Sequence, residues 1–160
     1  MALKAIRSSY EITYQSLEVV GISGSGKREL FVSPVPGDIF SAPRILQGWL
    51  QEIAVDYLPP LLEETAESQG FSFNRVTVRG QKTRWGSCSI KKNINLNRNL
   101  LFMTPEIVEY VIYHELTHLK VLDHSLKFWN ELETVFPNAQ LQRAQLRKLE
   151  RSAIPVWATV

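Results

Sequence analysis

The chain has 160 residues, of which 44% are hydrophobic and 21% are charged, and its formal net charge is +2 at pH 7. These values are ordinary for a soluble globular protein, so we expect a single domain over residues 1–160, and the small charge does not indicate a nucleic-acid partner. No run approaches the ~20 apolar residues of a membrane span, the N-terminus has no apolar signal-peptide core, and the single cysteine, Cys88, excludes an internal disulfide. We therefore expect a cytoplasmic protein without a membrane partner.

The first forty residues predict β structure. YEITYQSLEVVGI (10–22) and ELFVSP (29–34) hold β-branched and aromatic residues in short runs interrupted by glycine, serine and proline. Between them, GISGSGKR (21–28) resembles a phosphate-binding loop, but Arg28 stands where that loop needs a hydroxyl. The residues that follow also predict a strand, whereas such a loop must open a helix. We interpret the stretch as a turn between two strands and expect no nucleotide site.

Residues 42–70 predict helix. Pro43 suits a first helical turn, and apolar residues recur at helical spacing over positions 45–53. We expect Pro59 and Pro60 to end or kink this helix, because proline lacks the N–H of an interior helical hydrogen bond. The residues after them then continue the helix or start another.

Residues 71–103 predict three strands, in the runs FSFNRVTVRG (71–80), KTRWGSCS (82–89) and NINLNRNLLFM (93–103). The last two are separated by a polar stretch that predicts a turn. Basic residues gather in RVTVRGQKTR (75–84) and QRAQLRKLER (142–151). We interpret them as a solvated sheet edge and a helix face rather than as a nucleic-acid surface, although the sequence leaves the second possibility open.

Residues 104–152 predict three helices. The first covers TPEIVEYVIYHELTHLKVL (104–122), in which Thr104 is a good N-cap and apolar residues recur at helical spacing. The second covers about 125–136 and the third about 140–151. The sequence therefore predicts an α+β protein with a small sheet and several helices.

All the histidines of the chain lie within HELTHLKVLDH (114–124). His114 and His118 are four residues apart, which on a helix places them on one face with Cβ atoms ~5–6 Å apart. Both imidazoles can then reach one zinc ion. Glu115 lies beside them, where a carboxylate can accept a proton from a water molecule. The pattern is H-E-x-x-H, which predicts two metal ligands and a general base.

His124 is the candidate third ligand. If the helix ends near Val121, the chain can bend and return His124 to the metal. Three protein ligands and one open position describe catalytic zinc, whereas structural zinc is normally closed by four ligands. We therefore expect one zinc ion and hydrolysis of a peptide bond, with Glu115 as the general base and a peptide or protein as the substrate. The alternative is a non-catalytic zinc-binding adaptor, which has no use for Glu115.

A longer pattern carries a resemblance to a known family. TRWGSCS (83–89) and INLNRNLLFMTPEIVEYVIYHELTHLKVLDHSLKFW (94–129) resemble the YgjP-like metallopeptidase domain, a group of metal-dependent hydrolases with a small zincin-like fold. The resemblance is strongest over residues 75–137 and weakest over the first forty.

The resemblance implies that His114, His118 and His124 are zinc ligands and that Glu115 is the catalytic base. More distant SprT-like proteases act on DNA-bound proteins, and they keep a nucleic-acid role open as a lesser alternative. Within RWGSC, we interpret Trp85, Gly86 and Cys88 as structural, with Gly86 marking a bulge or a close backbone approach. Arg84 either lies near the metal or holds a helix C-terminus.

Overall fold

The structure is a computed structural model, and it describes residues 1–14, 21–25, 29–149 and 153–159. The elements are, in chain order, β1 Ala2–Leu3, η1 Lys4–Ile6, β2 Ser8–Ser9, β3 Glu11–Tyr14, β4 Gly21–Ser25, β5 Glu29–Ser33, α1 Ser41–Ser68, β6 Arg75–Arg79, β7 Gly86–Cys88, β8 Asn93–Asn97, η2 Arg98–Phe102, α2 Pro105–Thr117, α3 Leu126–Val135, α4 Ala139–Leu149 and η3 Val156–Ala158. The fold is α+β, as the sequence predicts.

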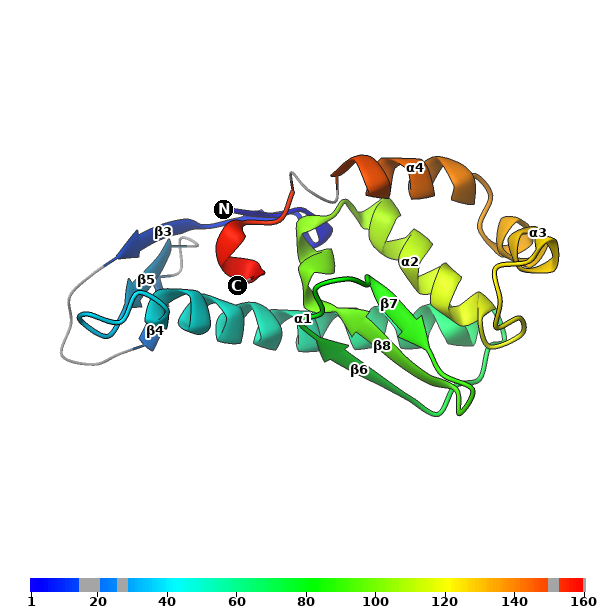
Figure 1. Ribbon diagram of the computed structural model, residues 1–160, viewed down its shortest axis with the longest axis horizontal. Coiled ribbons are helices and arrows are strands. Elements are labelled where there is room, and N and C mark those ends of the chain that lie inside the picture. Colours follow the sequence, from blue (N-terminus) through cyan, green and yellow to red (C-terminus); the bar gives the residue numbers. More distant parts are fainter. Residues whose placement is uncertain (15–20, 26–28, 150–152, 160) are drawn as a thin grey trace.

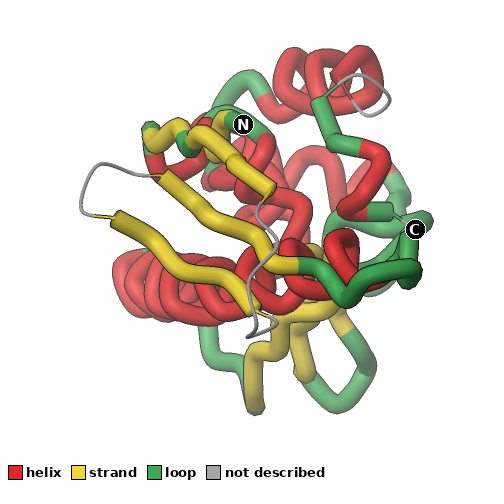
Figure 2. Tube along the Cα trace, turned by 90° about the vertical axis from the view of Figure 1, so that its left-hand side faces the viewer, coloured by secondary structure: helices red, strands yellow, loops and turns green. Residues whose placement is uncertain are grey.

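Two three-stranded sheets lie at different places along α1 (Figure 1). In the N-terminal sheet, β5 pairs in parallel with β3 and antiparallel with β4. In the second sheet, β8 lies in the middle, parallel to β6 and antiparallel to β7. The N-terminal sheet faces the viewer in Figure 2, and β7 lies in the other half of the molecule in Figure 1. Strand β7 is an edge strand of the second sheet and contacts α2, the helix that contains His114.

The stretch that resembles a phosphate-binding loop is part of the N-terminal sheet. Gly21–Ser25 form β4, with Gly21 opposite Ser33 and Ser25 opposite Glu29. The expectation of a turn is therefore wrong for residues 21–25, while residues 26–28 lie outside the described part. The residues after the stretch form strand β5 and not a helix, as predicted.

Helix α1 continues through Pro59 and Pro60, so of the two predicted effects, an end or a kink, the end does not occur. Each proline removes one interior hydrogen bond, but burial of the helix compensates for the loss. Its buried residues recur every four positions on both sides of the prolines, at Leu46, Leu50, Ala54, Leu58, Leu62 and Ala66. From Leu50 to Ala66 this apolar stripe belongs to the main core, and it keeps the two halves in one helix.

Each of the three runs over 71–103 contains a strand shorter than predicted, and at the end of the last run Arg98–Phe102 form the 3-10 helix η2. The cause is local, because the side chain of Asn97 accepts a hydrogen bond from the backbone N–H of Asn99 and turns the chain. The same side chain donates to the carbonyls of Gln81 and Arg84, both at 2.7 Å. Asn97 thereby fixes the segment that leads into β7.

The three predicted helices after residue 104 are present, and the first is shorter than expected. Helix α2 ends at Thr117, and His118 is its C-cap instead of an interior residue. Its buried residues Ile107, Val108, Val111, Ile112 and Leu116 pack in the main core. Within the described residues, no helix combines the length and apolar character that crossing a bilayer requires.

Candidate metal centre

The structure brings the three histidines together. The nitrogen atoms that they offer all lie within 4.8 Å of one another, and Nε2 of His124 is 2.9 Å from Nε2 of His114. His118 is buried, His114 is half-buried and His124 is exposed. A pocket of about 320 Å³ opens over them. The cluster therefore sits at the surface with two of its three side chains set into the protein.

The early end of α2 orients His118. After Thr117 the chain turns, with the N–H groups of both Lys120 and Val121 donating to the Thr117 carbonyl. This turn brings the Val121 carbonyl to the ring of His118, whose Nδ1 donates to it at 3.0 Å. A proton on Nδ1 leaves the lone pair on Nε2, the atom available to a metal.

His124 is held by the helix that follows it. The indole Nε1 of Trp129 donates to the backbone carbonyl of His124 at 3.1 Å, and Arg143 of α4 lies over the same indole at 4.5 Å. Trp129 thereby holds the segment that contains His124. Ser125 is the N-cap residue of α3, but its side chain accepts no hydrogen bond from a backbone N–H of that helix. The carboxylate of Asp123 accepts a hydrogen bond from the Ser125 N–H. The ring of His118 donates its hydrogen bond to the Val121 carbonyl and not to Asp123.

Glu115 lies against the backbone of β7. A Cβ atom at Gly86 would lie 2.6 Å from Oε1, 2.7 Å from Cγ and 2.8 Å from Cδ of Glu115. The residue at this position therefore has to be glycine if the carboxylate is to stay where it is. Of the two alternatives for Gly86, the close approach is the one found. Its partner, Glu115, could not be identified from the local sequence.

Burial controls the charges of the site. It raises the pKa of Glu115 to about 8, while the positive charge of Arg84 acts in the opposite direction. Burial, together with His118, His124 and Arg143, lowers the pKa of His114 to about 3. A neutral imidazole is the form that binds metal, so His114 is ready to act as a ligand at neutral pH.

Two buried polar atoms of this site have no hydrogen-bond partner among the described residues. They are Oε2 of Glu115 and Nδ1 of His114. Leaving a buried polar atom unpaired is costly, and such atoms commonly mark sites with a catalytic role or with an unseen ion or water. A set of three imidazole nitrogens with an adjacent carboxyl group fits a first-row divalent ion such as zinc. The residues present therefore fit a metal ion.

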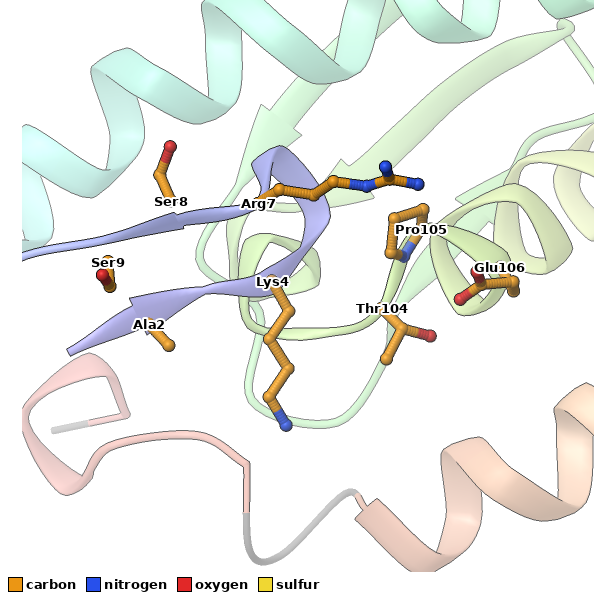
Figure 3. A pocket seen from close by; sticks show the side chains of 8 residues that line it. All are labelled: Ala2, Lys4, Arg7, Ser8, Ser9, Thr104, Pro105 and Glu106. Carbon is orange, nitrogen blue, oxygen red and sulfur yellow. The ribbon is translucent and has the colours of Figure 1, made fainter.

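A larger cavity, of about 500 Å³, lies at the other end of α2. It is bordered by Lys4 and Arg7 of the N-terminal segment and by Thr104, Pro105 and Glu106 at the start of the helix (Figure 3). The histidines lie at the C-terminal end of the same helix. Cavity volume alone therefore does not identify the pocket that contains the candidate metal ligands.

The comparison with known families decides what kind of protein this geometry serves. The family described as YgjP-like, metallopeptidase domain, matches residues 7–149. The chain belongs to this family. The YgjP-like match spans most of the chain and includes residues 7–40, which lie in the part where the sequence resemblance is weakest.

Two solved structures and one curated protein are similar to this chain. The crystal structure of the metallopeptidase zymogen of Pyrococcus abyssi abylysin is 32% identical, covers 61% of this chain and 99% of its own, and has a TM-score of 0.50. The zymogen of Methanocaldococcus jannaschii jannalysin is 27% identical, covers 59% and 95% of the two chains, and has a TM-score of 0.48. An uncharacterized protein of the same organism, MJ0123, is 29% identical over 80 residues, 48% of this chain and 73% of that protein. The similarity to the abylysin zymogen confirms the expected small zincin-like fold.

The structure also adds residues to this YgjP-like site that the sequence did not indicate. Tyr110, Val111 and Leu146 line a second pocket beside Glu115, together with Arg84. Tyr110 could have been found from its spacing, because it precedes His114 by four residues and so shares its helix face. Leu146 gave no such signal, because it lies in a different helix. Arg84 lies at both pockets, next to the histidines, which favours the first of its two expected positions.

Proposed function

We propose that the protein is a zinc-dependent peptidase that holds one zinc ion with His114, His118 and His124 and uses Glu115 as its general base. The observation that carries this proposal is the convergence of three imidazole nitrogens within 4.8 Å beside a buried, unpartnered carboxyl oxygen. Membership of a metallopeptidase family supports the same reaction class. We further propose that the enzyme acts in the cytoplasm on peptides or proteins.

Zinc, when bound, supplies Lewis-acid chemistry: it polarises a carbonyl group and makes a water molecule more acidic. Glu115 takes a proton from the attacking water and passes it to the leaving amine. In the metal-free protein, burial raises the pKa of this carboxyl to about 8, so the group can hold as well as release a proton near neutral pH. A positive charge at the histidines favours its ionised form before the reaction.

The second sheet offers a place for the substrate. Strand β7 is hydrogen-bonded to β8 on one side, and Gly86, Ser87 and Cys88 of this strand line the pocket that contains the histidines. A peptide laid along this edge can use main-chain hydrogen bonds for affinity, as strand addition does in other proteins. The scissile carbonyl then lies between β7 and the histidine cluster.

Zinc content and hydrolysis of a labelled, unfolded protein substrate test the proposal together. Glu115→Gln should retain one zinc ion per chain and lose hydrolysis by a factor of about 100 or more. Glu109→Gln, an exposed carboxylate on the same helix, is the matched control and should behave as the wild type. His118→Ala should lose the metal instead.

The same experiment separates the alternatives. A zinc-binding adaptor would bind zinc and hydrolyse nothing, in the wild type as in Glu115→Gln. The burial of Glu115 argues against an adaptor, because a structural site does not need a buried carboxyl with an unpaired oxygen. An SprT-like role predicts hydrolysis that DNA stimulates and that salt suppresses.

A further inference from the structure

The pocket beside Glu115, here called the side pocket, has a volume of about 210 Å³. Its inner wall is formed by Tyr110 and Val111 of α2 and Leu146 of α4, each at most 8% exposed. Trp85 forms the side towards the second sheet, and the exposed Thr83 and Arg84 lie at its mouth. The volume is below the about 300–1,000 Å³ of pockets for drug-sized ligands, so it suits a single amino-acid side chain.

The side pocket continues from the pocket over the histidines. The two share Arg84, Gly86, His114 and Glu115 as lining residues. A peptide with its scissile bond at Glu115 therefore has an adjacent side chain within reach of the side pocket. Its position next to the reacting bond is what a specificity pocket requires.

The chemistry of the lining selects among side chains. Its inner wall is apolar, and transfer of an apolar side chain from water to such a wall is favourable. The charged groups around it include three arginines and one carboxyl group, that of Glu115. Arg84 lines the mouth, and Arg143 and Arg147 act on the Tyr110 hydroxyl, where they counter the rise in its pKa that burial causes. A lysine or arginine side chain would meet these like charges, and an apolar one would not.

We propose that the side pocket selects substrates with a medium-sized apolar residue, such as leucine or methionine, next to the scissile bond, and that Leu146 sets the size limit. This inference rests on the proposed peptidase function for its biological meaning. The binding preference itself depends only on the pocket and is measured separately.

Binding is followed by NMR on zinc-loaded Glu115→Gln with labelled Leu146 and Val111 methyl groups. The probes are blocked hexapeptides of alanine with one varied position. Leucine or methionine at that position should shift both methyl signals, and lysine should shift neither. Cleavage of the same peptides by the wild type should favour leucine over lysine by about tenfold or more.

Two variants test the size limit. Leu146→Ala should move the preference about tenfold towards phenylalanine and tryptophan, while Leu141→Ala, exposed on the same helix, should leave it unchanged. Leu146 also belongs to the core, so Thr83→Phe at the exposed mouth provides a second test. It should weaken cleavage at leucine about tenfold relative to alanine, and Thr134→Phe on α3 is its control.

The outcomes are distinct. Selective methyl shifts without any cleavage would refute the proposed peptidase and leave the pocket's preference standing. Cleavage that ignores the varied residue, or that neither Leu146→Ala nor Thr83→Phe alters, would overturn the role of the side pocket. Absence of both binding and cleavage would overturn the two proposals together.

Discussion

Replacing Gly86 by alanine tests the placement of Glu115 without touching a proposed ligand. The backbone at Gly86 does not have a positive φ, so alanine is allowed there and only its methyl group matters. This methyl would lie 2.6–2.8 Å from three atoms of Glu115, whereas ordinary contact begins at 3.4 Å. The carboxyl group must therefore retreat by about 0.6–0.8 Å, the difference between these distances. A misplacement near 1 Å can cost about 100-fold in rate, or about 2.7 kcal/mol of transition-state stabilisation.

We expect Gly86→Ala to lower kcat/KM about 100-fold while zinc stoichiometry, measured by elemental analysis, stays at the wild-type value. Gly48→Ala is the matched control, since nothing lies within 4 Å of the added methyl on helix α1. It should keep full activity and gain up to about 1 kcal/mol in stability. Undiminished hydrolysis by Gly86→Ala would refute the argument, and so would loss of zinc, which would mean that the substitution damages the ligands instead.

Three further outcomes follow from the site. Trp129→Phe removes the hydrogen bond to the His124 carbonyl and should weaken zinc affinity about 10-fold. Competition with a chelator measures this affinity, and an unchanged value would contradict the prediction. The metal-free protein should be most stable between pH 4.5 and 6.5. Because the pKa of Glu115 is raised from 4.5 to about 8, its contribution to stability declines as pH rises from 4.5 to 8. Because the pKa of His114 is lowered from 6.5 to about 3, its contribution declines as pH falls below 6.5, and the two opposite slopes cancel between pH 4.5 and 6.5. Denaturation in chelator should show both declines, and Glu115→Gln should lose the alkaline one. Burial and the neighbouring Glu115 raise the pKa of Cys88 to about 11, so iodoacetamide should alkylate it far more slowly at pH 7.5 than it alkylates free cysteine.

The gathering of the histidines was predictable because it depends on local geometry. His114 and His118 follow from helical spacing, and His124 is so close in sequence that a single turn returns it. The place of the turn was missed by a few residues, because helix ends depend on weak local interactions. In the structure the chain leaves the helix after Thr117, and this earlier exit gives His118 its hydrogen bond to Val121.

Features that depend on distant contacts could not be predicted in the same way. The fit of Gly86 against Glu115 joins a strand to a helix 29 positions later, and no local pattern encodes it. Pro59 and Pro60 predict an end or a kink when only helix propensity is considered, but the buried stripe of α1 keeps the helix continuous across them. The side pocket likewise forms only when α4 packs on α2, so Leu146 carries no signal of its own.

The unequal exposure of the three histidines has a kinetic consequence. His118 is buried and His114 half-buried, whereas His124 is open to solvent in the short segment between α2 and α3. An ion can therefore exchange with solution most easily on the side of His124. In the proposed metal site all three side chains contribute to the equilibrium affinity, but the rate of metal release depends mainly on how often this one segment moves away. Two variants with equal affinity can thus differ widely in how fast a chelator empties them.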